Sequence, residues 1–340
     1  MGVKSLFVQD LAIDLGTANT IIIYNDEIAV EEPSIIAIDN NTKKVIAIGR
    51  NAMQMHGKTH DDIKTIRPLR DGVIADFYAA ELMLRGMIGM VKRKRTLFSP
   101  HLRMVIGIPS GITEVEKRAV KDSAEKAGCK EVKLIHEPMA AAIGIGIDVE
   151  EPVGNMVIDI GGGTTEIAVI ALGGIVCNQS IRIAGDEFTA DIIDYMRREH
   201  NIQVGERSAE KIKIEVGSAL TELENPPENY LVSGRDLMTG IPKQVSVNYA
   251  EIAQTLDKSI SKVEEAILKV LEVAPAELSG DIYQNGLYLT GGGALLRGLA
   301  KRISDKNKLP VHVADDPLRA VARGTGIALK NMHRFKFLIS

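Results

Sequence analysis

The sequence predicts an α/β protein built from two related halves, and three observations support this prediction. The chain has 340 residues, which is more than one typical domain needs. Runs of β-branched residues alternate with segments of helical periodicity, a pattern typical of α/β folds. A unit of strand, aspartate, glycine turn and second strand also occurs twice, as LAIDLGTANT at 11–20 and MVIDIGGGTTEIAV at 156–169. Two copies of one supersecondary unit indicate two similar halves.

Between the two copies of the repeated unit, residues 101–129 predict a strand, a loop and a helix. Either Ser110 or Thr113 is expected to cap this helix. Glu116 stands three residues after Thr113, which is the spacing of a capping box. Gly128 is expected to end the helix.

The rest of the chain continues the alternation of strands and helices. Residues 132–146 predict a short strand, a turn at Pro138 and an alanine-rich helix. In the second half a proline pair at 226–227 interrupts the helical pattern, and polar strands follow around Leu231 and Val245. The other predicted elements are helices at 186–201, 208–220 and 249–274, then a strand, glycine turn and helix at 286–304.

Composition excludes several classes of protein. Hydrophobic residues make up 45% and charged residues 25% of the chain, as in soluble globular proteins. The net charge of −4 provides no basic field, so no nucleic-acid partner is expected. Two cysteines far apart in sequence predict neither a disulfide framework nor a zinc ribbon, and a reducing cytosol is the simplest compartment. The seven histidines show no metal-binding spacing, so no structural transition metal is expected. The N-terminal residues predict no signal peptide, and no apolar run reaches the roughly 18 residues of a membrane span.

Glycine turns suit a phosphate chain because they present backbone N–H groups without side-chain bulk. The turns of the repeated unit are Gly16-Thr17-Ala18-Asn19 and Gly161-Gly162-Gly163-Thr164. Either one alone is compatible with an ordinary tight hairpin. Because there are two, each with an aspartate two residues before its first glycine, we interpret them as holding one phosphate chain from opposite sides.

Asp14 and Asp159 are the aspartates that precede these turns. Magnesium keeps several of its waters and takes few carboxylates, while phosphate oxygens complete its octahedron. We therefore expect both aspartates to bind Mg²⁺ through water. The alternative is that they only cap their turns, which aspartate does well.

Hydrolysis of a phosphate chain also requires a water in line with the terminal phosphate. Glu137 is our candidate for orienting it, because Pro138 disfavours helical backbone at the preceding residue and so is expected to hold the carboxylate in a turn. A Glu-Pro pair alone is a weak signal, since most such pairs are surface turns. Thr164 and Thr17 are expected to add hydroxyl contacts to the phosphate or the water.

A third glycine turn, Gly291-Gly292-Gly293-Ala294, follows a predicted strand at 287–290 and opens a predicted helix. This arrangement brings backbone close to a ligand at a helix N-terminus. It is a weak signal by itself, because helix–strand packing also uses glycine.

Two other glycine patterns do not indicate nucleotide motifs. The segment 57–59 (GKT) resembles the end of a P-loop, but Ala52 stands where that motif requires glycine. Gly144 and Gly146 begin a GxG pattern, but Val149 stands at its third glycine position. A Rossmann fingerprint is therefore absent.

Together these motifs resemble the superfamily of actin-like proteins, sugar kinases and heat-shock chaperone ATPases. DLGTANT is similar to its first phosphate motif, DIGGGTT to its second, LTGGGALL to its adenosine motif and EPMAAAIG to the segment with the hydrolytic glutamate. Within that superfamily the chain most resembles the MreB family of bacterial cell-shape actins. The segments that carry this resemblance reach from the N-terminus to Gly326 and include EPSIIAI, IRPLRDGVIADF, GIPSGITEVEKRAV, GRDLMTGIPKQV and ADDPLRAVARGTG.

The resemblance implies an actin-like (ribonuclease H-like) duplicated fold, with two lobes of two subdomains around a nucleotide cleft that holds ATP and Mg²⁺. It assigns 1–33 and 68–148 to subdomain IA, 34–67 to IB, 149–184 and 251–340 to IIA, and 185–250 to IIB.

The resemblance also implies roles for individual residues. Glu137 corresponds to the water-activating residue, and the segment SAEKIK places Ala209, Glu210, Lys211 and Ile212 at the ribose and adenine. His136 departs from the acidic residue expected beside Glu137. A charged imidazole there either tunes the glutamate or has no effect, and we favour no effect.

For partners, the resemblance implies a homopolymer in the form of a double filament on the inner face of the cytoplasmic membrane. It further implies association with membrane proteins of the cell-wall elongation machinery, and an ATPase activity coupled to assembly. Nothing in composition or periodicity predicts a filament.

Residues 92–98 are the candidate membrane contact. Lys92, Arg93, Lys94 and Arg95 form a basic cluster that would attract anionic lipid, and Leu97 and Phe98 follow it. The alternative is a helix that ends in cations, with both apolar side chains in the core. The resemblance favours the membrane contact. Val3, Leu6, Phe7 and Val8 form a second, weaker candidate anchor.

Three other functions compete with the filament. A small-molecule kinase would need a catalytic base beside its acceptor hydroxyl, and no acceptor motif is evident. A chaperone would need a substrate-binding half after the ATPase, whereas the sequence stops soon after the last motif. A DNA-segregating actin relative is opposed by the MreB-like segments. The kinase is the principal alternative.

Overall fold

The computed structural model of the chain describes residues 8–91 and 101–339. The predicted membrane residues Leu97 and Phe98 and the basic cluster before them lie outside these ranges. So do Val3, Leu6 and Phe7 of the predicted N-terminal anchor, and the side chain of Val8 is not described either. Within the described ranges, no helix combines the length and the apolar character required to cross a bilayer.

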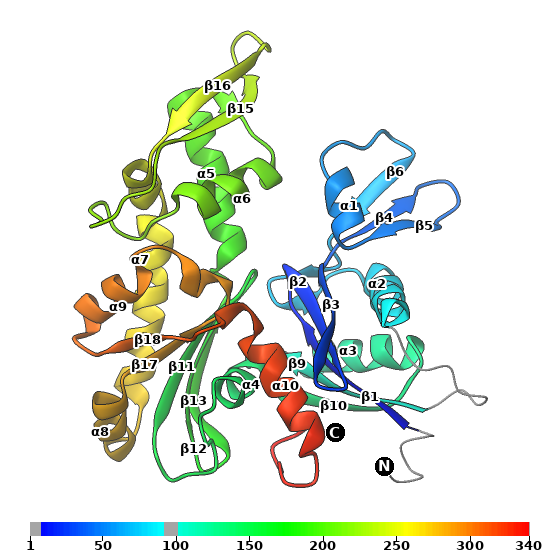
Figure 1. Cartoon of the computed structure of the whole chain (residues 1–340), viewed down its shortest axis with the longest axis vertical. Helices are drawn as coiled ribbons and strands as arrows, with labels where there is room; N and C mark the ends of the chain where they lie inside the picture. The colour runs from blue at the N-terminus through cyan, green and yellow to red at the C-terminus, as the bar shows by residue number, and fades with distance from the viewer. Residues whose placement is uncertain (1–7, 92–100, 340) are drawn as a thin grey trace.

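Two five-stranded mixed sheets with the same strand order form the centres of two lobes (Figure 1). In each, an antiparallel meander of three strands continues into two parallel strands. The first sheet has the order β10-β9-β1-β2-β3, and the second has the order β18-β17-β11-β12-β13. The matching order and direction confirm the predicted duplication. The strands are β1 (Val8–Leu15), β2 (Asn19–Tyr24), β3 (Glu27–Pro33), β9 (His101–Ile108), β10 (Cys129–His136), β11 (Asn155–Ile160), β12 (Thr165–Ala171), β13 (Gly174–Ile181), β17 (Leu287–Thr290) and β18 (Val311–Val313).

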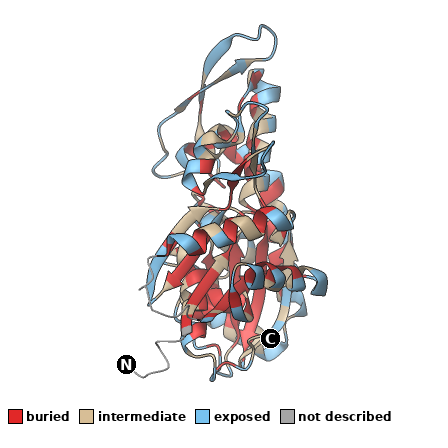
Figure 2. Ribbon diagram, turned by 90° about the vertical axis from the view of Figure 1, so that its right-hand side faces the viewer, coloured by how far each residue is buried: buried red, intermediate tan, exposed pale blue. Residues whose placement is uncertain are grey.

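Helices cover the outer face of each sheet with apolar side chains. The first lobe uses two helices for this purpose and the second lobe uses three. Figure 2 shows the buried residues concentrated in the sheets and in the helix faces turned toward them. These helices are α2 (Phe77–Met90) and α3 (Glu114–Lys126) in the first lobe, and α7 (Tyr249–Val273), α8 (Ala276–Asn285) and α9 (Leu299–Asn307) in the second.

Each lobe also carries a smaller subdomain, inserted after the third strand of its sheet. The first insertion forms a three-stranded sheet with one helix, followed by a two-stranded hairpin. It comprises β4 (Ile36–Asp39), β5 (Val45–Ile48), α1 (Arg50–Met55), β6 (Ile63–Ile66), β7 (Leu69–Arg70) and β8 (Val73–Ile74). The second insertion has two helices and a different three-stranded sheet. It comprises α5 (Gly185–His200), β14 (Ile202–Gln203), α6 (Glu206–Val216), β15 (Tyr230–Asp236) and β16 (Pro242–Val247).

A third apolar core joins the lobes and is built around two crossing helices, α4 (Glu137–Gly144) and α10 (Ala320–Lys330). Both lie between the two large sheets, and each follows the last strand of its own sheet. Although α10 follows the second sheet, the strands on which it packs beside α4 are β1, β2 and β9 of the first. Separating the lobes would therefore pull α10 away from one of its attachments.

The two helices cross so closely that only glycine fits at two positions. A Cβ on Gly144 would lie 1.9 Å from the carbonyl oxygen of Ala320, and one on Gly324 would lie 1.7 Å from that of Ala140. Each helix thus presents an alanine and a glycine four residues apart to the other. This spacing was visible in the sequence, where Gly144 appeared only as part of an incomplete Rossmann pattern.

Most predicted local elements are confirmed, including the two glycine hairpins and the long helix α7. Thr113, not Ser110, caps α3, and it forms a complete capping box with Glu116. Two details were wrong. Glu137 is the first residue of α4 rather than part of a separate turn, since proline is tolerated in the first helical turn. The third glycine turn opens only a short 3₁₀ helix, η2 (Gly292–Leu295), and the α-helix begins later at Leu299.

Replacing Gly324 by alanine tests the helix crossing. The added Cβ would meet backbone, which has no rotamer through which to yield, so Gly324→Ala is expected to lower the free energy of unfolding by about 1–3 kcal/mol. Gly280→Ala in α8 is the matched control, because among the described residues no heavy atom outside its own stretch of helix lies within 4 Å of the added Cβ. That change is expected to raise stability by about 0.5–1 kcal/mol. Urea denaturation measures both, and equal effects would contradict the crossing.

Candidate functional site

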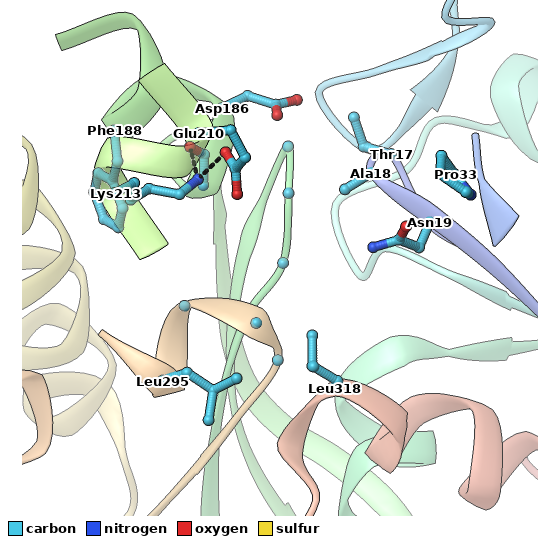
Figure 3. Close-up of a pocket in the computed structure, with 18 of the residues that line it drawn as sticks. Thr17, Ala18, Asn19, Pro33, Asp186, Phe188, Glu210, Lys213, Leu295 and Leu318 are labelled. Atoms are coloured by element: carbon cyan, nitrogen blue, oxygen red, sulfur yellow. Dashed lines mark hydrogen bonds and ion pairs between the residues drawn. The ribbon is translucent and has the colours of Figure 1, made fainter. Parts of the chain in front are cut away.

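The two predicted glycine turns lie face to face between the lobes. A Cβ on Gly162 would lie 2.7 Å from the Cβ of Ala18, and one on Gly163 would lie 2.7 Å from Oγ1 of Thr17. Side chains at these glycines would therefore force the turns apart. Both turns line a cleft of about 660 Å³ that receives residues from both lobes and both small subdomains (Figure 3).

Each turn is braced by the segment that follows the third strand of its own sheet. After β3, the Ser34 hydroxyl donates to the carbonyl of Gly16 (2.6 Å), and the Ser34 N–H donates to that of Ala18 (2.9 Å). After β13, the first N–H groups of α5 donate to the second turn, from Gly185 to Gly161 (3.1 Å) and from Asp186 to Gly162 (2.7 Å). These bonds occupy the turn carbonyls in both halves.

The cleft brings together most of the residues selected from the sequence. Those that line it are Asp14, Gly16, Thr17, Ala18, Asn19, Glu137, Asp159, Gly161, Gly162, Gly163, Thr164, Glu210, Lys211, Gly291, Gly292 and Gly293.

Three of the predicted contacts are absent from the cleft lining and need correction. Ala209 and Ile212 are fully buried in the core of the second lobe, because they occupy the face of α6 that packs against α5 and β15. The opposite face of α6 lines the cleft instead. Ala294 is also buried in that core, while Leu295 beside it lines the cleft.

Three carboxylates lie at the floor of the cleft, and the protein disfavours their charged forms. Withdrawal from water, with the charge of Asp159 nearby, raises the pKa of Asp14 to about 7. Withdrawal from water also raises the pKa of Asp159 to about 7, although the Thr290 hydroxyl donates to Oδ1 of Asp159 (3.0 Å) and partly opposes this. The pKa of Glu137 is raised well above its usual value by the same loss of water and by neighbouring carboxylates. A cation at this floor would relieve all three effects.

The donor set suits a cation that keeps its water. Within the described ranges, no group of three or more His, Cys, Asp or Glu side chains is arranged to enclose a metal ion. Two aspartates beside a phosphate-sized turn are instead typical of Mg²⁺, which takes one or two carboxylates and completes its shell with water and phosphate.

Glu166 is a fourth carboxylate near the floor, and the sequence analysis missed it. It is fully buried and lies directly after the second turn, in β12. The Ser180 hydroxyl (2.5 Å) and both the N–H (3.0 Å) and the hydroxyl of Ser110 donate to it. Ser110 belongs to the first lobe, so this carboxylate joins the lobes beneath the cleft instead of facing a ligand. Ser110, one of the two candidate caps of α3, thus links the lobes and does not cap the helix.

His136 lines a separate cavity of about 220 Å³ and not the main cleft. Burial lowers the pKa of its imidazole, and its Nδ1 has no hydrogen-bond partner among the described residues. A lowered pKa opposes a charged imidazole beside Glu137, which agrees with the expectation that His136 does not tune the glutamate.

Lys213 is a cleft cation that the sequence analysis missed. Its Nζ donates to the carbonyl of Gly185 (2.7 Å) and to the hydroxyl of Thr189 (3.0 Å), and it pairs with Glu210 (2.7 Å). It therefore fastens α6 to the N-terminus of α5, which braces the second turn. Its spacing of three residues from Glu210 on one helix face was the available signal.

One end of the cleft is apolar. Ile214, Leu295 and Leu318 are exposed by 60%, 57% and 48%, although all three are large hydrophobic side chains. Figure 3 shows Leu295 and Leu318 pointing into the cleft opposite the first glycine turn. Exposed apolar side chains with a few polar groups are typical of a ligand pocket. The cleft can therefore accept a flat apolar ring at this end and an anion at the turns.

Comparison with known proteins agrees with this geometry. The family model described as MreB/Mbl protein matches residues 8–337. The cell shape-determining protein Mbl of Bacillus subtilis (strain 168) is 46% identical over 330 residues, which cover 97% of this chain and 98% of that protein.

Solved structures give the same result for the fold. The crystal structure of MreB5 of Spiroplasma citri bound to AMPPNP superposes with a TM-score of 0.90 at 38% identity, covering 96% of this chain and 97% of that one. The MamK double helical filament gives a TM-score of 0.80 at 20% identity, over 95% of this chain and 99% of that one. The latter likeness concerns the fold alone. Together these neighbours confirm the predicted actin-like α/β fold.

The raised pKa of Asp14 predicts a pH-dependent cost in the chain free of nucleotide and divalent cations. Between pH 3.8 and about pH 7 the Asp14 carboxyl keeps its proton in the folded chain, whereas in the unfolded chain it has released it. Folding stability therefore falls as pH rises through this window. Asp14→Asn lacks this loss. Its stability advantage over the wild type is expected to grow by up to about 1.4 kcal/mol per pH unit within the window, then level off. Urea denaturation at several pH values tests this, and a pH-independent difference would contradict it.

Proposed function

This chain belongs to the MreB/Mbl protein family, and we propose that it is an ATP-dependent actin-like cytoskeletal protein whose membrane-associated filaments organise cell-wall synthesis and set rod shape. The observation that carries the proposal is the meeting of two glycine turns, one from each lobe, above a floor of three carboxylates. Family membership leaves no support for the small-molecule kinase, so that alternative is not retained.

ATP is the proposed ligand. The N–H groups of the turns at 16–19 and 161–164 would hold the phosphates, with the hydroxyls of Thr17 and Thr164 beside them. Glu210 and Lys211 would contact the ribose and base, and the apolar end near Leu295 would hold the adenine face. Support comes from MreB5 of Spiroplasma citri, which was crystallised with AMPPNP and with ADP.

Mg²⁺ is the proposed metal, held by Asp14 and Asp159 through water. The raised pKa of both aspartates supports this, because such carboxylates gain most from a cation. The metal would neutralise charge on the phosphates. The same positive charge would favour the ionised form of Glu137.

Hydrolysis is proposed to depend on Glu137. Its carboxylate at the start of α4 would orient a water toward the terminal phosphate, with the Thr164 hydroxyl as a second contact. The serines around Glu166 support this arrangement indirectly, since both oxygens of that neighbouring carboxylate already accept hydrogen bonds from them.

The division into four subdomains remains our proposal, with IA at 1–33 and 68–148, IB at 34–67, IIA at 149–184 and 251–340, and IIB at 185–250. The two large sheets and the two inserted small sheets support it. Self-association into a double filament is proposed from family membership. MamK, which shares the fold, forms a double helical filament.

The location is proposed to be the cytoplasm, at the inner face of the cell membrane. Leu97 and Phe98 would enter the lipid, and the cations at 92–95 would attract its anionic headgroups. Membrane proteins of the elongation machinery would be the partners there, and no nucleic acid is proposed.

Sedimentation and phosphate release test the function together. With ATP and Mg²⁺ the wild type is expected to pellet as filaments and release phosphate. Glu137→Gln should still bind ATP within a few-fold of the wild type, while hydrolysis falls by about 10²–10⁴-fold because the orienting carboxylate is lost. Glu125→Gln, which changes an exposed carboxylate on α3, is the control and should hydrolyse normally. A wild type that neither pellets nor hydrolyses ATP would overturn the proposal.

The membrane contact is tested with vesicles of anionic lipid, at protein concentrations below assembly. Leu97→Ser combined with Phe98→Ser is expected to abolish co-sedimentation with vesicles and leave ATP binding intact. Leu172→Ser combined with Val176→Ser removes an exposed apolar pair from the other lobe and is the control. Equal loss of binding in both double variants would contradict a specific role for the first pair.

A further inference from the structure

A cluster of charged side chains joins the two small subdomains across the mouth of the cleft. Arg67, which follows β6, donates through Nη1 to the carboxylate of Glu206 at the start of α6. The same Nη1 lies 3.6 Å from Oδ1 of Asp186 in α5. His56, after α1, places its Nε2 3.2 Å from Oε2 of Glu206. We call these four residues the clasp.

The clasp is organised on both sides before it closes. On the first subdomain, the Nδ1 of His56 lies 2.8 Å from the hydroxyl of Thr65, which fixes the ring beside Arg67. On the second, the Asp186 N–H is bonded to the glycine turn, so the start of α5 is held in place. The Arg67 side chain is only 19% exposed. Partial burial makes this pair less screened than an ordinary surface ion pair.

The clasp lies at the end of the cleft that is farthest from the floor where the lobes are joined. The lobes are joined at the floor by the α4–α10 crossing and by the bonds from Ser110 to Glu166. The clasp joins α1 and β6 to α5 and α6 at the opposite, outer end, where Figure 1 shows the small subdomains facing one another. A rotation about the floor would displace the outer end most. Contacts there therefore oppose opening most effectively.

We propose that the clasp holds the cleft closed over its ligand and limits the rate at which nucleotide leaves. The inference rests on the proposed nucleotide binding and adds a control on it. Arg67 is the centre of the clasp, because its guanidinium donates to Glu206 and also forms an ion pair with Asp186, both in the opposite lobe. Without it, Glu206 and Asp186 have no other guanidinium of the first lobe as an ion-pair partner among the described residues.

A double-mutant cycle tests the clasp in the full chain. The measurement is the dissociation rate of a fluorescent ATP analogue with Mg²⁺, at concentrations below assembly. Arg67→Ala and Glu206→Ala are each expected to raise the rate about five- to tenfold, the scale of a partly buried ion pair. The double variant should release no faster than the faster single variant, because both changes break one interaction. Unchanged rates, or effects that multiply, overturn the clasp.

Lys330→Ala is the matched control. Like Arg67→Ala, this change removes the positively charged partner of an ion pair, here the pair between Lys330 and Asp26 (2.6 Å). Both residues lie away from the mouth of the cleft, Lys330 on α10 and Asp26 in the β2–β3 turn. Its dissociation rate should equal that of the wild type. A rate increase like that of Arg67→Ala would mean that loss of any such pair has this effect.

Small-angle scattering of the nucleotide-free chain separates the clasp from a direct ligand contact and from the proposed function. Arg67→Ala should increase the radius of gyration relative to the wild type, because the cleft opens without any ligand present. An unchanged radius overturns the clasp even if nucleotide leaves faster. If the wild type binds no nucleotide, the proposed function fails, and the scattering result still decides whether the clasp exists.

Discussion

The close crossing of α4 and α10 is the constraint on which the rest of the molecule depends. Backbone meets backbone at Gly144 and Gly324, and the surrounding apolar core draws on both large sheets. Because α10 follows one sheet and packs on strands of the other as well as on α4, the two lobes share this apolar core. The two glycine turns are held opposite one another by this core, and so is the first residue of α4, Glu137.

Burial of the carboxylates in the cleft opposes folding of the chain. Asp14, Asp159 and Glu137 are withdrawn from water near one another, and the cost appears as raised pKa values. Glu166 is also buried near the floor, but both of its oxygens accept hydrogen bonds from hydroxyl or N–H donors. The contrast separates a carboxylate that joins the lobes from three whose charged forms are disfavoured by burial. Unfavourable groups of this kind concentrate at functional sites.

The two halves agree in their large sheets and differ in what is inserted after the third strand. The shared part supplies the paired turns, and therefore the general ability to hold an anion. The insertions supply what is particular to this cleft: α6 with Glu210 and Lys213 on one side, and Arg67 with His56 on the other. The side chains that differ between the two sides of the cleft mouth thus come from the parts that the duplication does not repeat.

The sequence was sufficient to predict the duplicated α/β fold, both glycine hairpins, the capping-box spacing of Thr113 and Glu116, and the carboxylates of the floor as candidates, because these predictions use neighbouring residues and short periodicities. It did not determine which face of α6 meets the cleft, so Ala209 and Ile212 were misplaced while Lys213 was overlooked. Nor did it reveal that Gly144 meets Ala320, that Ser110 reaches Glu166, or that Arg67 bonds Glu206, 139 positions away. These contacts arise from the packing of the two sheets and their helices, and no local pattern predicts them because the partners lie far apart along the chain.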